Sequence, residues 1–220
     1  MFGSQSVDRA LAILTMVGRA AERGETLSAI VAESGLNKPT VRRLLLALIR
    51  AGLVEQDQKS RRYFLGEETY VLGSLAARRF GLLELSIDSL VRLSRRTEDA
   101  SFISVRRGTY AVCLYREEGT FPIRTHALQA GFEHPLGCGA GSLALLAALT
   151  DEEVEAVLAA NEAVLKAEYP LLPPERIRAD IAEAREKGYS LNPGLIVPNS
   201  WGIGAVVRYP DGMPAGALSI

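Results

Sequence analysis

A tight glycine turn between two helix patterns is the feature that most constrains how this chain can fold. Gly35 can adopt the left-handed backbone that such a turn needs, Leu36 can fill the core beneath it, and Asn37 is a good helix N-cap. Pro39 follows in the first helical turn, where its missing N–H does no harm. The pattern predicts a helix, a tight turn and a second helix within residues 27–50.

Both predicted helices have an apolar stripe, and the second also has an exposed polar start. The first begins at Leu27 or Ser28, and its expected buried side chains are Ile30, Val31 and Ala32. The expected stripe of the second helix is Val41, Leu44, Leu45 and Leu48. Polar and basic side chains point outward near its N-terminal end, namely Lys38, Thr40, Arg42 and Arg43. A DNA recognition helix needs this arrangement, because its first turns meet base edges and phosphates.

A hairpin pattern follows, with strands expected at residues 52–56 and 62–65 and a polar loop at 57–61. Three cations lie at or beside its tip, Lys59, Arg61 and Arg62. A basic loop or a basic helix face alone is usually just solvated. Together with a preceding helix at 6–23, however, they predict a winged helix-turn-helix over residues 1–66 that sits in the major groove of DNA. The expected DNA contacts are Ser28, Lys38, Thr40, Arg42, Arg43, Lys59, Arg61 and Arg62.

Charge is distributed unevenly along the chain. The net charge of −1 argues against nucleic-acid binding, but residues 1–66 hold ten Lys and Arg against six Asp and Glu, a net +4. The remaining residues hold 15 against 20, a net −5. A basic head on an acidic body is expected when only one part meets phosphate. Ordinary hydrophobicity, no long apolar segment and only two cysteines predict a globular, cytoplasmic chain with no membrane partner.

The remaining residues predict a linker helix and a second domain. The linker helix spans residues 67–84, with an apolar side available to a partner subunit; Arg78 and Arg79 could touch phosphate, although an exposed helix face is favoured. Residues 85–220 show strands and helices in clusters. Helices are expected at 85–97, 143–149, 150–160 and 173–187, and strands at 101–105, 110–115, 121–125, 202–209 and 215–220. Because strict βαβ alternation is missing, an antiparallel sheet with flanking helices is favoured over a doubly wound one, giving a two-domain α+β fold.

A glycine-rich run precedes one of these helices. Three glycines within residues 137–141 would expose backbone N–H groups to a carboxylate or another anion, while close packing of helix on sheet is an equal alternative. The run matches neither a Walker A loop nor a dinucleotide fingerprint. Cys138 with His126 and His134 leaves open a thiol nucleophile or a metal site. A small buried thiol is favoured, because no third group and no zinc spacing accompany them, and neither metal nor cofactor is expected.

Five segments together resemble the IclR family of bacterial transcription regulators: residues 6–14, 35–45, 135–141, 187–190 and 217–220. The resemblance covers essentially the whole chain in the family's order. It implies a winged helix-turn-helix, a linker helix and a GAF-like effector domain over residues 85–220. It also implies homodimers or dimers of dimers that bind palindromic double-stranded operator DNA, as repressors or activators, under control of a small-molecule effector such as an organic or aromatic acid.

The resemblance also places an effector pocket. By position the family's pocket falls on Gly139, Ala140, Asn192, Gly202 and Ser219, and their neighbours Cys138, Gly141 and Trp201 join the expected lining. Sensors of small carboxylates in the family tend to carry an acidic group where Asn192 lies and a cysteine where Gly202 lies. The frequent glutamate after the Gly-Tyr-Ser segment is missing as well, with Gly194 and Leu195 in that stretch. These departures predict a larger, less polar cavity and an effector bigger than a two- or three-carbon acid.

Two rival functions stay open from the sequence. One is a GAF-like thiol or hydrolytic enzyme that uses its N-terminal part for assembly, and the other is an architectural winged-helix protein without a ligand. The family continues into a final helix beyond the strand that ends this chain at Ile220. We therefore expect that helix to be absent from the sequence.

Overall fold

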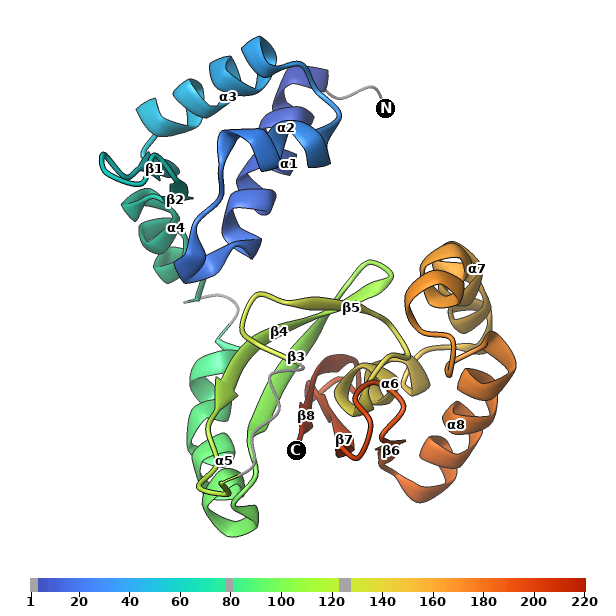
Figure 1. Ribbon diagram of the computed structural model, residues 1–220. Coiled ribbons are helices and arrows are strands. Elements are labelled where there is room, and N and C mark those ends of the chain that lie inside the picture. Colours follow the sequence, from blue (N-terminus) through green and yellow to red (C-terminus); the bar gives the residue numbers. More distant parts are fainter. Residues whose placement is uncertain (1–3, 78–80, 123–127) are drawn as a thin grey trace. The chain divides into compact units, whose positions relative to one another are not determined.

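The structure is a computed structural model that describes residues 4–77, 81–122 and 128–220 (Figure 1). The chain divides into two compact units, Met1–Phe80 and Gly81–Ile220. Each unit has a hydrophobic core of its own, as expected of independently packed domains.

The N-terminal unit is the winged helix-turn-helix that the sequence predicts. Three helices pack together, and a short antiparallel hairpin and a further helix follow them along the chain (Figure 1). The elements are α1 (Gln5–Arg19), a 3₁₀ turn (Ala21–Arg23), α2 (Leu27–Ser34), α3 (Lys38–Arg50), β1 (Val54–Gln56), β2 (Tyr63–Leu65) and α4 (Glu67–Ala77). The strands β1 and β2 form the wing.

The turn between α2 and α3 has the predicted chemistry. Gly35 ends α2 in the left-handed conformation, with φ of 64°. The Asn37 side chain accepts a hydrogen bond from the Thr40 N–H at 2.9 Å, which satisfies one of the unpaired donors at the start of α3. Thr26 caps α2 in the same way by accepting from the Ala29 N–H at 3.2 Å, a contact that the sequence analysis did not assign.

The core of the N-terminal unit confirms the stripe predicted for α3. All four of its predicted side chains are buried, together with residues of α1, α2 and the wing: Ile13, Val17, Ile30, Val41, Leu44, Leu45, Leu48, Val54 and Tyr63. The prediction for α2 was correct for Ile30 but wrong for Ala32, which is exposed. An eight-residue helix offers the core only a narrow stripe, and Ala32 lies outside it.

The described residues of the C-terminal unit form a six-stranded sheet in which all neighbouring strands are antiparallel, with strand order β5-β4-β3-β8-β7-β6. Its strands are β3 (Ser101–Arg107), β4 (Tyr110–Glu117), β5 (Glu133–Pro135), β6 (Ser190–Pro193), β7 (Trp201–Arg208) and β8 (Pro214–Ser219). Its helices are α5 (Leu82–Thr97), α6 (Ala140–Ala147), α7 (Asp151–Glu168) and α8 (Pro174–Lys187). This confirms the antiparallel α+β fold.

Helices α5 and α6 cover opposite faces of this sheet. Ser101 of β3 donates to the Leu90 carbonyl of α5 at 2.9 Å, so alternate residues of β3 starting at Ser101 face α5. The next residue, Phe102, is paired with Ser219 of β8, which contacts the start of α6 at Gly141. Successive side chains of a strand point to opposite faces, so α6 lies on the other face. Figure 1 shows the sheet between the two helices.

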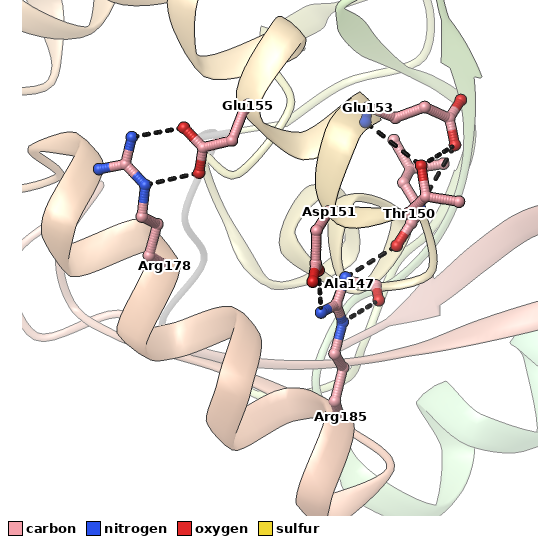
Figure 2. Close-up of polar contacts among 8 residues, drawn as sticks. Ala147, Thr150, Asp151, Glu153, Glu155, Arg178 and Arg185 are labelled. Carbon is pink, nitrogen blue, oxygen red and sulfur yellow. Dashed lines mark hydrogen bonds and ion pairs between the residues drawn. The ribbon is translucent and has the colours of Figure 1, made fainter.

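Helix α8 is tied to the end of α6 and to α7 by two arginines (Figure 2). Arg185 donates to the carbonyls of Ala147 and Leu149 at 2.9 and 2.8 Å and to the Asp151 carboxylate at 2.6 Å. Seven residues earlier on α8, about two helical turns, Arg178 forms two hydrogen bonds of 2.7 Å with the carboxylate of Glu155 on α7. The C-terminal end of α6 is therefore fixed by a side chain from another helix.

Several elements differ from the sequence prediction. Helix α6 begins at Ala140 rather than at residue 143, so the last glycine of the run lies inside its first turn. Helix α7, expected at 150–160, starts with a capping box of Thr150 and Glu153 and continues to Glu168. Strands β5 and β6 were not predicted. Of the strand expected at 121–125, the first two residues are not in a strand, and the rest lies outside the described residues, as do Arg78, Arg79 and His126.

Candidate DNA-binding surface and ligand cavity

The start of α3 presents the predicted cations to solvent. Lys38, Arg42 and Arg43 are exposed, and within the described part of the chain no ion pair or hydrogen bond engages their side chains. Thr40 is half-buried beneath them, and its N–H is the one that Asn37 caps. A positive helix end with unengaged cations is arranged to receive phosphate oxygens and base edges.

The wing is held in shape by its own side chains. Asp57 accepts hydrogen bonds of 2.6 Å from both the N–H and the hydroxyl of Ser60, and these bonds hold the pKa of Asp57 below its usual value. Lys59 and Arg61 extend into solvent from this turn. Arg61 has a φ of 60°, a left-handed backbone that the turn imposes on a non-glycine residue. The wing thus presents two cations on a defined loop.

Two of the predicted DNA contacts lie in different surroundings. Ser28 is exposed in the first turn of α2. Arg62 is half-buried, and its guanidinium donates to the carbonyls of Arg23 and Gly24 at 3.3 and 2.9 Å. These bonds hold the base of the wing against the segment that follows α1, so Arg62 has a structural use that sequence spacing did not indicate.

A cavity of about 530 Å³ opens in the C-terminal unit, over the face of the sheet that α6 covers. Its wall includes every residue that the sequence assigned to the effector pocket: Cys138, Gly139, Ala140, Gly141, Asn192, Trp201, Gly202 and Ser219. A volume of this order suits a small organic molecule. The cavity therefore brings together predicted pocket residues that lie up to 81 positions apart in the sequence, from Cys138 to Ser219.

The N-terminal end of α6 lies at this cavity without a side-chain cap. Gly139 occupies the N-cap position with φ of 84°, a conformation suited to glycine, and no side chain caps this end within the described residues. A Cβ placed on Gly141 would lie 3.0 Å from the Ser219 hydroxyl oxygen, so the first turn rests directly on β8. The first N–H groups of a helix lack intrahelical acceptors and carry a partial positive charge.

Strands β6 and β7 approach α6 closely at the same place. A Cβ on Gly204 would lie 2.6 Å from the Ala140 carbonyl oxygen, so only glycine fits there without a shift. The Ser190 hydroxyl donates to that carbonyl at 2.6 Å. Gly202 is nearly as close, since its Cβ would lie 3.3 Å from that of Ala140, and its absence leaves space beside Asn192. The Asn192 side chain accepts from the Leu195 N–H at 3.0 Å.

The cavity wall also includes residues that the sequence did not indicate as ligand contacts, among them Phe102, Ser104, Ala111, Arg116 and His134. They come from β3, β4 and β5. The sequence shows that side chains of β3 alternate between the two faces of the sheet. Which of these faces lies toward the glycine run depends on the pairing of β3 with β8, which follows more than one hundred residues later. His134 faces the Tyr169 hydroxyl at 3.0 Å, and burial raises the pKa of Tyr169 to about 12.

The thiol of Cys138 is poorly suited to nucleophilic chemistry. Burial, with a smaller contribution from the charge of Glu168, raises its pKa to about 12, so the reactive thiolate is scarce near neutral pH. Among the described residues, no group of three or more His, Cys, Asp or Glu side chains is arranged to hold a metal ion. No helix in the described part is long and apolar enough to cross a membrane.

A winged helix-turn-helix followed by a second domain with its own cavity is the architecture of a two-domain DNA-binding regulator. Two family models match this chain: "IclR helix-turn-helix domain" over residues 6–58 and "Bacterial transcriptional regulator IclR C-terminal" over residues 75–220. The chain belongs to the IclR family of DNA-binding transcriptional regulators.

Individual relatives agree with this assignment. The transcriptional regulator KipR of Bacillus subtilis is 27% identical over 195 residues, which cover 89% of this chain and 77% of the relative. A crystal structure of an IclR regulator from Silicibacter is 30% identical, covers 97% of this chain and 84% of its own, and has a TM-score of 0.82. An IclR homologue from Microbacterium hydrocarbonoxydans, crystallised with 4-hydroxybenzoate, is 23% identical over 98% of this chain and 88% of its own, with a TM-score of 0.80, and so shares the fold.

Proposed function

We propose that this protein recognises double-stranded operator DNA through Lys38, Thr40, Arg42 and Arg43 of α3. Ser28 and the wing cations Lys59 and Arg61 extend this surface. The observation that supports the proposal is that Lys38, Arg42 and Arg43 at the start of a capped helix have exposed side chains, with no ion pair or hydrogen bond among the described residues. Arg62 is left out, because DNA contact would require its bonds to the Gly24 and Arg23 carbonyls to break.

The test is fluorescence anisotropy with labelled DNA from upstream of the protein's own gene. Arg43→Ala should lose about 1–3 kcal/mol of operator binding if Arg43 reads a base, with little change on unrelated DNA. If it meets only phosphate, the loss should be equal on all sequences and the salt dependence shallower. Arg95→Ala, which removes an exposed arginine of α5, is the matched control. Unchanged operator affinity for Arg43→Ala would remove this residue from the interface.

The cavity of the C-terminal unit is proposed to bind an organic or aromatic acid as effector. Its carboxylate would meet the N–H groups at the start of α6, near Ser219, where no side chain caps the helix among the described residues. The volume of about 530 Å³ exceeds what a two- or three-carbon acid fills. Calorimetric titration should give binding for an aromatic acid such as 4-hydroxybenzoate. Tight binding of glyoxylate or pyruvate alone would contradict the proposed size class.

A homodimer is proposed as the functional unit, assembled in part through α4. Three large side chains of α4 are at least half exposed: Tyr70 at 77%, Leu75 at 58% and Leu72 at 50%. An apolar helix face without a cover is typical of an oligomer contact. Leu75→Glu should lower the mass measured by light scattering. An unchanged assembly would place the dimer contact elsewhere.

The proposed mechanism is a shift of population between two placements of the DNA-binding heads in the dimer. Half-sites on DNA are separated by a fixed number of helical turns, so a modest change in head spacing weakens binding strongly. We propose a regulator that has no catalytic activity of its own and that acts in the cytoplasm, with residues 67–84 linking the DNA-binding domain (1–66) to the effector domain (85–220). Effector at saturating concentration should change operator affinity in the anisotropy assay.

A further inference from the structure

The cavity contains a buried cation that the proposed function does not use. Arg116 of β4 lines the cavity, and its side chain is only 8% exposed. A guanidinium is a permanent cation, and burying one is costly unless anionic groups lie close to it. One of its nitrogens lies 3.1 and 3.2 Å from the two oxygens of Glu118, which is itself half-exposed. A cation so placed can exchange this partner for another carboxylate.

The strand register aligns Arg116 with the proposed carboxylate site. Ser219, Phe102 and Arg116 are directly paired across the adjacent strands β8, β3 and β4. Directly paired side chains lie on the same face of a sheet, and neighbouring strands are about 4.8 Å apart. The Cα atoms of Ser219 and Arg116 are therefore about 10 Å apart, two strand spacings.

The three positions of this row offer different chemistry. At one end the start of α6 rests on Ser219 and favours an anion. Phe102 lies in the middle and contributes an aromatic side chain to the cavity wall. At the other end the Arg116 guanidinium lies 5.8 Å from the centre of the Phe102 ring, which keeps the cation beside the ring. A ligand with an acidic group at each end of a flat body matches this order.

We propose that Arg116 is a specificity-determining residue that binds a second acidic group, so that the preferred effector is a rigid dicarboxylate. One carboxylate meets the start of α6 and the other meets Arg116, which gives up its contact with Glu118. This inference rests on the proposed ligand site at α6. Glu98 and Asp99 also line the cavity and are exposed, so water and salt screen their repulsion of the ligand, whereas the buried Arg116 is screened less.

The test compares two ligands that differ by one carboxylate, benzene-1,4-dicarboxylate and benzoate, by calorimetry on the full chain. Wild-type protein should bind the dicarboxylate at least about tenfold more tightly, the size expected for a charge-assisted contact. Arg116→Met should remove this preference and leave benzoate binding unchanged. Equal affinity for both ligands in the wild type would overturn the inference while leaving the proposed acid site in place.

A second variant provides a test that does not depend on whether the Arg116→Met protein folds. Glu118→Gln removes the negative charge of Glu118 from beside Arg116, and it should tighten binding of the dicarboxylate selectively. If Glu118→Gln changes neither ligand and the wild type shows no preference, Arg116 does not recognise a ligand acid. If neither ligand binds wild-type protein, the proposed acid site at α6 is contradicted, and with it the inference about Arg116, which depends on that site.

Discussion

Arg185 should contribute more to the stability of the C-terminal unit than Arg178, although both arginines lie on α8 and both contact a carboxylate on α7. Within residues 4–77, 81–122 and 128–220, the hydrogen bonds of the Arg178 side chain go only to the exposed carboxylate of Glu155. Arg185 also donates to the carbonyl of Ala147, the last residue of α6 (Figure 2), and to that of Leu149 just beyond it. The last carbonyls of a helix have no intrahelical donor, so a bound guanidinium satisfies them and favours the negative end of the helix dipole.

The expected loss follows from these contacts. Arg185→Met removes two charge-assisted hydrogen bonds to carbonyls, each worth about 1 kcal/mol at a site this accessible to water, because the Arg185 side chain is 37% exposed. Its pair with Asp151, which is 88% exposed, adds little. The total is about 2 kcal/mol. In a chain of this size that corresponds to a fall in melting temperature of about 4–8 °C.

A single tryptophan makes the measurement specific to the C-terminal unit. Trp201 is the only tryptophan in the sequence and lies at the start of β7, so its fluorescence anisotropy follows unfolding of this unit in urea. Methionine keeps most of the arginine's apolar stem, so the variant tests the guanidinium rather than packing. Arg178→Met is the matched control and should shift the midpoint little, with any shift disappearing in high salt.

Two results would refute this reasoning. One is an equal loss for Arg185→Met and Arg178→Met, which would mean that the carbonyl contacts add nothing. The other is a loss for Arg185→Met that high salt abolishes, since hydrogen bonds to carbonyls are much less sensitive to screening than exposed ion pairs.

Three further predictions concern other parts of the chain. Gly204→Ala should destabilise the C-terminal unit by about 1–3 kcal/mol and weaken ligand binding, because the new Cβ would lie 2.6 Å from the Ala140 carbonyl oxygen. Urea unfolding measures the stability and calorimetry the affinity. Wild-type values in both assays would show that the sheet accommodates the methyl group without loss of stability. Burial raises the pKa of Cys138 to about 12 and that of Cys113 to about 11, from 9.0. Their contribution to stability is therefore fully present below pH 9 and is lost as the pH rises from 9 toward 11 and 12. Unfolding midpoints measured across this range should decline, and a flat profile would contradict the prediction. Arg62→Met should lower the stability of the N-terminal unit by about 1–2 kcal/mol, because it removes hydrogen bonds to two backbone carbonyls. Circular dichroism should show this unit melting at a lower temperature. Unchanged melting together with lost DNA binding would instead indicate that Arg62 contacts DNA.

The N-terminal unit could be predicted from the sequence because its signals are local. The turn depends on Gly35 and the cap on Asn37, which are neighbours in the chain, and the stripe of α3 repeats within thirteen residues. The exposure of the cations at the start of α3 follows from that same stripe. Arg62 is the exception. Its partners lie 38 and 39 positions earlier, and no periodicity in the sequence connects such distant groups.

The cavity could be predicted only in part. The glycine run and the family resemblance located Gly139 and Ser219, but the start of α6 was placed three residues late because glycines argue against helix when read alone. Glycine suits position 141 within the helix because a Cβ there would lie only 3.0 Å from the Ser219 hydroxyl oxygen. Arg116 was missed because its place in the wall depends on the pairing of β4 with β3 and of β3 with β8, which is tertiary information.

The strand order also fixes when the cavity can come into existence during synthesis. Strands β3, β4 and β5 form one half of the sheet and β6, β7 and β8 the other, and the halves join only where β3 pairs with β8. The row from Ser219 to Arg116 crosses that seam, so a ribosome must make more than one hundred residues after Phe102 before the row is complete. Pairing across so long a loop is slow. The nascent chain can therefore form a DNA-binding head well before it can form the cavity.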